Sequence, residues 1–334
     1  MIFNDLSRKE RLEIYQITQD KLGLSGVIIE KDWWVTAVLR ALFSLPYAES
    51  LSFKGGTSLS KCWGLIERFS EDIDIAVNRE YLGFTGTLSK TQISDRLRRV
   101  ACSFVREKLQ FDLVKQLEIN GISPDNFSIK VNITPISTTD PEIIEVEYQS
   151  LFEEFGYIKR RVIVEVSGRS MSEPLQLVQL QSIIDEEFPK TDFTEKAFEL
   201  QAVVPQRTFI EKICLLHEEF AQSIEFMRTE RMSRHLYDLV QIMDTSVATE
   251  ALTNKKLYSS VVEHRRIFVG LKEFDYSTLA PQSINIIPPA NIIDLWRTDY
   301  EIMQSTMIYG DTLPFNELID KIKQLNERVN HIVW

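Results

Sequence analysis

The spacing of apolar side chains divides the first 200 residues into helices and strands. Apolar positions recur at helical spacing over 5–22, 30–43 and 90–120, which predicts three helices, the last of them long or broken. Alternation of apolar and polar residues predicts strands at 72–77, 127–133, 142–148 and 161–167. This part of the chain is therefore predicted to mix helices with strands.

From Pro205 onward the pattern is mainly helical. Thr208 and Glu211 have the spacing of a capping box at the start of a helix. The apolar face of that helix contains Phe209, Ile213, Leu216 and Phe220. We therefore predict two domains, residues 1–200 and 201–334.

The short apolar run 51–53 is predicted to be a further strand, and a glycine turn follows it. Gly55 and Gly56 carry no Cβ, so the backbone can bend tightly there and approach a ligand closely. Thr57 or Ser58 is predicted to cap a helix from 59 to about 66. Backbone N–H groups at such a turn, aided by the helix dipole, can bind a triphosphate. Most glycine turns are structural, however, and this one lacks the Lys-Ser/Thr pair of a P-loop.

Two carboxylates share one face of the strand that comes next. Asp72 and Asp74 are two residues apart, so their side chains point the same way, whereas Ile73 and Ile75 point into a core. Like charges this close raise each other's pKa unless a cation binds between them. Mg²⁺ prefers such oxygen ligands, and a pair of metal ions can hold both reacting oxygens of a phosphoryl transfer. A solvated strand face is the alternative, and the glycine turn one helix earlier favours the metal site.

Glu165 is a candidate third carboxylate on the strand at 161–167. Such a residue can add charge to hold a metal ion or accept the proton of an attacking hydroxyl. A glutamate on an exposed strand face is the alternative. Arg169 follows in a turn, where it could orient Glu165 or contact a phosphate bidentately.

The helical half supplies one cation and one carboxylate of interest. Lys212 lies beside the apolar face of its helix. It is interpreted either as an ordinary surface lysine or as a cation that contacts triphosphate oxygens when pyrophosphate leaves. Asp238 is predicted to face a cleft at the start of its helix. His235 is interpreted as a packed or nucleotide-stacking histidine rather than as a catalyst. Lys31 and Asp32, beside two tryptophans, are interpreted first as packing residues and are kept as second-rank functional candidates.

Composition limits the possible partners. The 334 residues carry a formal net charge of −11, which argues against broad affinity for nucleic acid. No run of eighteen apolar residues predicts a membrane span, the N-terminus lacks the pattern of a signal peptide, and the three cysteines lack metal-ligand spacing, so we expect a cytoplasmic protein with no membrane partner. Local basic clusters are solvated faces or a track for a polynucleotide: Arg96, Arg98, Arg99, Arg106 and Lys108; Lys159, Arg160 and Arg161; Arg228, Arg231 and Arg234.

Four segments, in order, resemble motifs of one family. Residues 55–61 (GGTSLSK) and 68–74 (RFSEDID) resemble motif I of the AbiEii/AbiGii toxin family, within the polymerase-β-like nucleotidyltransferase superfamily. Residues 165–174 (EVSGRSMSEP) resemble its second conserved block. Residues 207–218 (RTFIEKICLLHE) are similar to motif III, and 233–239 (SRHLYDL) to motif IV.

The resemblance implies a fold and a set of roles. The fold would be α+β, with a nucleotidyltransferase-like mixed sheet, flanking helices and a helical C-terminal domain that completes the active site. Mg²⁺ (or Mn²⁺) would be bound by Asp72, Asp74 and Glu165, and Lys212 and Asp238 would be catalytic. The nucleotide-binding residues would be Gly55, Gly56, Thr57, Ser58, Arg68 and Lys212.

The same resemblance implies transfer of a nucleoside monophosphate from an NTP to an acceptor hydroxyl, with release of pyrophosphate. Family members are toxins of toxin–antitoxin or phage-defence (abortive infection) pairs, and some modify tRNA 3′ ends. The expected partners are an NTP, a tRNA or protein acceptor, and a cognate antitoxin that binds DNA. Two alternatives stay open: modification of a protein side chain, which the acidic surface would suit, and an NTP-binding regulator without turnover.

Overall fold

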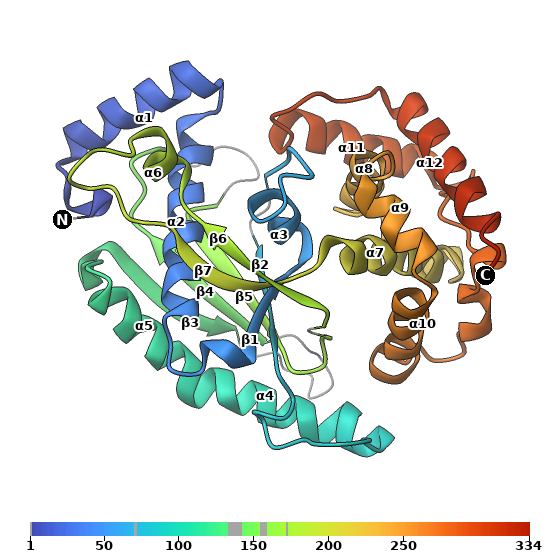
Figure 1. The fold of residues 1–334 in the computed structure, drawn as a ribbon. Coiled ribbons are helices and arrows are strands. Elements are labelled where there is room, and N and C mark those ends of the chain that lie inside the picture. Colours follow the sequence, from blue (N-terminus) through green and yellow to red (C-terminus); the bar gives the residue numbers. More distant parts are fainter. Residues whose placement is uncertain (1, 70–71, 133–141, 154–158, 172) are drawn as a thin grey trace. The chain divides into compact units, whose positions relative to one another are not determined.

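The computed structural model describes residues 2–69, 72–132, 142–153, 159–171 and 173–334 (Figure 1). By its internal contacts the chain forms two compact units. The first contains Met1–Cys62 and Ser70–Val203, and the second contains Trp63–Phe69 and Val204–Trp334. The division into domains at residue 200 stays a prediction, but these contacts group the short segment Trp63–Phe69 with the C-terminal residues.

Seven strands in the described part of the first unit form one mixed sheet, in the order β3-β4-β5-β2-β1-β7-β6 (Figure 1). The central strand β2 pairs antiparallel with β1 and parallel with β5, and β1 pairs parallel with β7. The strands are β1 (Leu51–Lys54), β2 (Asp72–Val77), β3 (Phe127–Asn132), β4 (Glu142–Tyr148), β5 (Arg161–Ser167), β6 (Leu175–Leu180) and β7 (Phe198–Val203). The predicted α+β fold with a mixed sheet is confirmed.

Two strands of this sheet were not predicted. β6 is an edge strand on which apolar Leu175 and Leu177 are exposed, so its burial does not alternate. In β7 buried and exposed side chains alternate only in part, because the consecutive residues Ala202 and Val203 are both buried. Pairing with β1, far away in the sequence, fixes β7 in the sheet.

Helices pack on the apolar face of the sheet. α2 contacts β5 and β7, α4 contacts β5, and α5 contacts β3. Ile73 and Ile75 of β2 are almost fully buried on this face, as the alternation predicts. The helices of this unit are α1 (Arg8–Leu22), α2 (Gly26–Phe43), α3 (Gly55–Lys61), α4 (Arg98–Phe104), α5 (Gln110–Ile119) and α6 (Ile183–Glu187). The predicted long helix is present, because the π-helical segment Val105–Leu109 joins α4 to α5 and a second one, Gln92–Leu97, directly precedes α4.

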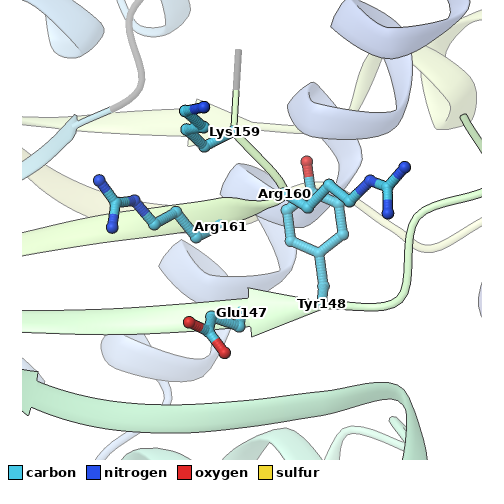
Figure 2. A pocket seen from close by; sticks show the side chains of 5 residues that line it. All are labelled: Glu147, Tyr148, Lys159, Arg160 and Arg161. Atoms are coloured by element: carbon cyan, nitrogen blue, oxygen red, sulfur yellow. The ribbon is translucent and has the colours of Figure 1, made fainter. Parts of the chain in front are cut away.

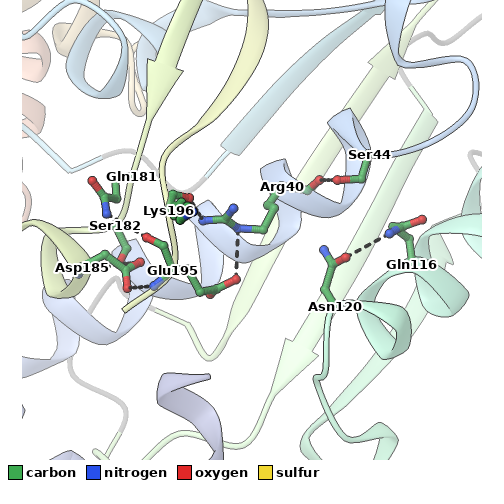
Figure 3. Close-up of polar contacts among 9 residues, drawn as sticks. All are labelled: Arg40, Ser44, Gln116, Asn120, Gln181, Ser182, Asp185, Glu195 and Lys196. Atoms are coloured by element: carbon green, nitrogen blue, oxygen red, sulfur yellow. Dashed lines mark hydrogen bonds and ion pairs between the residues drawn. The ribbon is translucent and has the colours of Figure 1, made fainter. Parts of the chain in front are cut away.

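Polar contacts fix the segment between α6 and β7 against α2 (Figure 3). Arg40 of α2 forms an ion pair of 3.2 Å with Glu195 and donates to the backbone carbonyl of Lys196 at 2.9 Å. The backbone N–H of Glu195 in turn donates to the carboxylate of Asp185, at 2.9 Å. These bonds hold the chain that leads into β7, the neighbour of β1.

The second unit is helical, as predicted. Its described helices pack around α7 and α8: α7 contacts α8, α9 and α10, and α8 contacts α11 and α12. The predicted apolar face of α7 is buried, and Phe220 packs edge-on against the buried ring of Trp296, with ring centroids 5.1 Å apart. The helices are α7 (Pro205–Phe220), α8 (Ser233–Ile242), α9 (Ser246–Thr253), α10 (Lys255–His264), α11 (Ile293–Thr306) and α12 (Phe315–Asn330).

Backbone bonds tie the segment Trp63–Phe69 to this helical unit. The N–H of Phe69 donates to the carbonyl of Met307 at 2.7 Å, and Arg68 forms an isolated antiparallel bridge with Ile308. The side chain of Arg68 is thereby placed among the helices. Within the described ranges, none of the helices is both long and apolar enough to cross a membrane.

The predicted helix caps are wrong. α3 begins at Gly55 and ends at Lys61, so Thr57 and Ser58 lie inside it rather than before it. α7 begins three residues before Thr208, and no side chain caps it. In α7 the fixed φ of Pro205 suits the first turn, so the helix begins earlier than the capping signal indicates. α3 begins at Gly55, whose φ is positive.

Candidate active site

The site in the first unit is a row of charged residues across three strands. Lys54 on β1, Asp74 on β2 and Glu165 on β5 are direct partners in the sheet register. Residues opposite each other in a sheet project from the same face. Asp72 lies on this face too, two residues before Asp74 and opposite Ile163. The pairing thus brings the three predicted carboxylates together on one face of the central strands.

The carboxylate of Asp74 lies directly against the glycine turn. Gly55 has φ +80°, a conformation that side chains other than glycine rarely adopt. A Cβ at position 55 would lie 1.9 Å from Oδ2 of Asp74. The missing side chain of Gly55 is therefore the space that the carboxylate uses, and the predicted close approach is a contact between turn and strand.

The side chains of α3 fix the helix on β2 rather than face a ligand. The hydroxyl of Thr57 donates to the backbone carbonyl of Asp72, and that of Ser58 donates to the carbonyl of Gly55 at 2.9 Å. At the end of α3, Lys61 forms an ion pair with Asp32. Nucleotide binding by Thr57 and Ser58 stays a prediction, and it would have to use their backbone groups.

Lys31 and Asp32 serve packing in the first unit. The other carboxylate oxygen of Asp32 accepts from the N–H of Ile183 at 2.8 Å, which links α2, α3 and α6. Lys31 is fully buried, and its Nζ donates to the carbonyl of Lys159 at 2.6 Å. These contacts favour the structural interpretation of both residues.

Lys54 is a part of the row that the sequence analysis missed. It directly precedes the glycine turn and pairs with Asp74, and its Nζ donates to the hydroxyl of Ser170 at 3.2 Å. The backbone N–H groups of Arg169 and Ser170 donate to the hydroxyl of Ser167, which closes the turn after β5. A signal was present in the sequence, since a cation at the end of the strand before the turn would balance the neighbouring carboxylates.

The chemistry of the row suits a hard divalent cation. Three carboxylates and no nitrogen or sulfur ligand form the donor set that Mg²⁺ or Mn²⁺ prefers. Among the residues that the structure describes, no three His, Cys, Asp or Glu side chains are already grouped around a possible ion position. The shared face and register of Asp72, Asp74 and Glu165 are what fit such an ion.

A second charged cluster is buried in the helical unit. Asp238 on α8 is completely buried, and Arg68 binds both of its oxygens, from Nε at 2.6 Å and from Nη2 at 2.8 Å. Nζ of Lys212 on α7 lies 2.8 Å from Oδ2 of the same carboxylate. Asp238 is the sixth residue of its helix and fully enclosed, so its predicted position at a helix start facing a cleft is wrong.

Burial and charge together set the protonation of this cluster. Burial alone would raise the pKa of Asp238, but the charges of Arg68 and Lys212 outweigh it and hold that pKa below its usual range. Burial also lowers the pKa of Lys212, and the nearby guanidinium of Arg68 adds to this effect. The cluster thus has one firmly ionised carboxylate shared by two cations.

His235 accompanies Lys212. Its Nδ1 lies 3.2 Å from Nζ of Lys212, so a charged lysine donates to it and the ring proton resides on Nε2. Burial and the adjacent charges of Lys212 and Arg234 hold the pKa of His235 well below its ordinary value. The ring is therefore neutral at pH 7 and packed beside the lysine, as its interpretation predicted.

Comparison with known proteins identifies the family. The model of one protein family matches residues 37–322 of the chain. That family is described as "nucleotidyl transferase AbiEii toxin, type IV toxin–antitoxin system". The chain belongs to the AbiEii family. The predicted resemblance is thereby confirmed, and this AbiEii-family chain is a nucleotidyltransferase. No protein of curated function matches it.

Three solved structures are similar to the AbiEii-family chain. MenT4, a nucleotidyltransferase toxin from Mycobacterium tuberculosis H37Rv, is 17% identical over 97% of this chain and 98% of its own, with a TM-score of 0.44. JHP933 from Helicobacter pylori is 13% identical over 92% and 93%, with a TM-score of 0.43. A putative nucleotidyltransferase from H. pylori is 15% identical over 92% and 96%, with a TM-score of 0.43.

The motif residues of the AbiEii-family chain are divided between the two units. Motif I supplies the glycine turn and Asp72 and Asp74 to the first unit, but its Arg68 belongs to the second. Arg68 is buried and binds Asp238, so a direct role in nucleotide binding stays a prediction. Ser70 of motif I and Ser172 of the second block lie outside the described residues.

The first prediction concerns the contact between Gly55 and Asp74. Gly55→Ala puts a methyl group where the carboxylate lies, so we expect nucleotidyl transfer to fall by about tenfold or more and stability to fall by at least the ~1–2 kcal/mol of the left-handed backbone. Gly23→Ala is the matched control, because Gly23 has φ +71° with no atom within 4 Å of a Cβ. Equal activity of the two variants would show that the contact is unimportant.

The second prediction concerns the buried carboxylate. Asp238→Asn leaves Arg68 and Lys212 as two buried cations with no anion, so we expect a loss of about 3–5 kcal/mol in the free energy of unfolding. Denaturant unfolding measures it. Asp244→Asn, at an exposed carboxylate that pairs with Lys321 at 3.4 Å, should change stability by less than about 0.5 kcal/mol. An Asp238→Asn protein of normal stability and no activity would contradict the structural role.

The third prediction is a pH dependence from His235. Its pKa in the folded protein is lowered, so the unfolded chain takes up the proton first as pH falls below about 6.5. Stability is then complete above pH 6.5 and falls on acidification, by at most about 1.4 kcal/mol per pH unit for this one proton. Thermal unfolding between pH 7.5 and 5.5 should be less pH-dependent in His235→Asn than in His331→Asn, where the histidine is exposed. Identical profiles would contradict the assignment.

Proposed function

We propose that this protein transfers a nucleoside monophosphate from an NTP to an acceptor hydroxyl in a reaction that needs Mg²⁺ or Mn²⁺. The observation that carries the proposal is the row of Lys54, Asp74 and Glu165 in register across β1, β2 and β5, with Asp74 against Gly55. A metal-assisted phosphoryl transfer requires carboxylates on a rigid strand beside a backbone turn that can approach phosphates. The sheet provides that rigid support.

Each residue of the row has a proposed task. Asp72 and Asp74 would hold the divalent cation, and Glu165 would add negative charge there or accept the proton of the acceptor hydroxyl. Lys54, on the other side of Asp74, limits the repulsion among the carboxylates. When bound, the cation would neutralise charge on the reacting phosphate. The backbone N–H groups of 55–58 are proposed to bind the triphosphate.

Lys212 is proposed to be required for transfer through its positive charge. The buried carboxylate of Asp238 holds its ammonium group at 2.8 Å, and Arg68 fixes that carboxylate from the other side. Asp238 and Arg68 would then be positioning residues, since they act through Lys212. Lys212→Met, which removes the charge and keeps the chain length, should lower transfer more than it lowers NTP affinity.

Membership of a toxin family supports a biological role as the toxin of a toxin–antitoxin pair. We propose that the acceptor is the 3′ end of an RNA such as tRNA, so that transfer stops translation, and that a cognate DNA-binding antitoxin restrains it. A role in phage defence follows if infection releases that restraint. The protein would act in the cytoplasm, where NTP and RNA are available.

One labelling experiment tests the function. The protein is incubated with each α-labelled NTP, Mg²⁺, cellular RNA and cellular protein, and label is followed on gels. We expect label on RNA, reduced about 10²-fold or more in Asp74→Asn. Asp125→Asn is the matched control, because Asp125 is exposed in the first unit and its carboxylate makes no contact that the site uses.

Other results would select another function. Label on protein alone would favour modification of a protein side chain and contradict an RNA acceptor. NTP binding with no label transferred to either acceptor would favour a regulator without turnover. Undiminished labelling by Asp74→Asn would contradict the proposed site itself.

A further inference from the structure

A basic pocket lies in the first unit where β4 ends and β5 begins (Figure 2). Its volume is about 350 Å³. The described residues that line it are Glu147, Tyr148, Lys159, Arg160 and Arg161, and we call it the 159–161 pocket. None of these residues belongs to the charged row of the candidate active site, so this pocket is a separate feature of the same unit.

The charges of the 159–161 pocket favour an anionic ligand. Its described lining residues include three cations and one carboxylate, a formal charge of +2. The carboxylate of Glu147 is already bound by Lys130, at 2.8 Å to each oxygen. Lys159 and Arg160 are exposed. Arg161 binds Glu145 through Nη1 at 2.8 Å, and its buried Nε has no hydrogen-bond partner in the described part of the structure.

The backbone that carries these cations is fixed. The carbonyl of Lys159 accepts from the buried Nζ of Lys31 at 2.6 Å, and the carbonyl of Arg160 accepts from the N–H of Tyr148 at 3.1 Å. The ring of Tyr148 stacks on Trp34 of α2, with centroids 4.9 Å apart. The cations therefore project from a rigid support, which lowers the entropic cost of binding a ligand.

Some cations of the other basic clusters form ion pairs with internal carboxylates. These pairs are Arg99 with Asp95, Arg106 with Glu142, Lys108 with Asp112, and Arg228 with Glu219. In a chain with a net charge of −11, a pocket whose described lining has excess positive charge stands out from its surroundings. This lining supports the interpretation of the 159–161 cluster as a polynucleotide track.

Arg161 of the 159–161 pocket and the charged row lie on one face of the sheet. Arg161 and Glu165 are four residues apart on β5, so their side chains project from the same face. At the rise of a strand, this spacing is about 13 Å. A stacked polynucleotide, which rises ~3.4 Å per nucleotide, covers that distance in about four nucleotides.

We propose that the 159–161 pocket binds a backbone phosphate of a polynucleotide acceptor, about four nucleotides from the hydroxyl that reacts. The proposal rests on the proposed function and names the class of acceptor for the same site. Lys159 and Arg160 supply charge and donors to the phosphate oxygens, and Arg161 adds positive charge beside them. Such contacts position the strand without reading its sequence.

RNA binding in the absence of NTP tests the proposal separately from transfer. Anisotropy of a labelled RNA hairpin with a six-nucleotide 3′ extension is measured at several salt concentrations, using the full chain. The pocket variant is Lys159→Gln with Arg160→Gln, and the control is Lys9→Gln with Lys190→Gln, which removes the same charge from exposed positions of the first unit. Affinity for NTP is measured in parallel.

We expect about tenfold weaker RNA binding by the pocket variant alone, with the salt dependence of log Kd smaller by about 0.7 for the one lost phosphate contact. NTP affinity should not change, which also verifies folding. Lys159→Arg with Arg160→Lys should bind RNA normally. Equal RNA affinity of pocket and control variants, or an equal loss of NTP binding, would overturn the proposal. If only the pocket variant binds RNA more weakly but no label is transferred in the labelling experiment, the RNA-binding role of the pocket is supported and only the transfer reaction is refuted.

Discussion

The close approach of Asp74 to Gly55 is the constraint on which the first unit depends. A carboxylate that occupies the place of a missing side chain forces a glycine with positive φ at the end of β1. The same residue is flanked in register by Lys54 and Glu165, so strand pairing rather than loop conformation sets the spacing of the charges. Helices on the apolar face keep these strands rigid, and the opposite face is left for chemistry.

In the helical unit, opposite charges also lie in contact, but there they are buried. Asp238 is completely buried and stabilises two cations, Arg68 and Lys212, each held within 3 Å. Burying these three charged groups costs little folding free energy only when all three are present. Removal of any one of them leaves an uncompensated buried charge and destabilises the unit. Because Arg68 comes from the segment that precedes Asp72, motif I contributes to the cores of both units.

Much of this could be predicted from the sequence, for physical reasons that differ by element. Alternation revealed β2 and β5 because one face of each is buried, and the spacing of Asp72 and Asp74 then gave their common face. Edge strand β6 was missed because exposed leucines hide its period. The partnership of Asp238 with Arg68 spans 170 residues and leaves no local signal, so only the folded chain reveals it.

Binding of Mn²⁺ to the purified protein, followed by electron paramagnetic resonance, tests the central claim most directly. If the row across β1, β2 and β5 is the metal site, the wild-type protein binds Mn²⁺, and binding is lost or strongly weakened in both Asp74→Asn and Glu165→Gln. Glu145→Gln, on the same face but already paired with Arg161, should bind as the wild type does. Undiminished Mn²⁺ binding by Asp74→Asn would contradict the account.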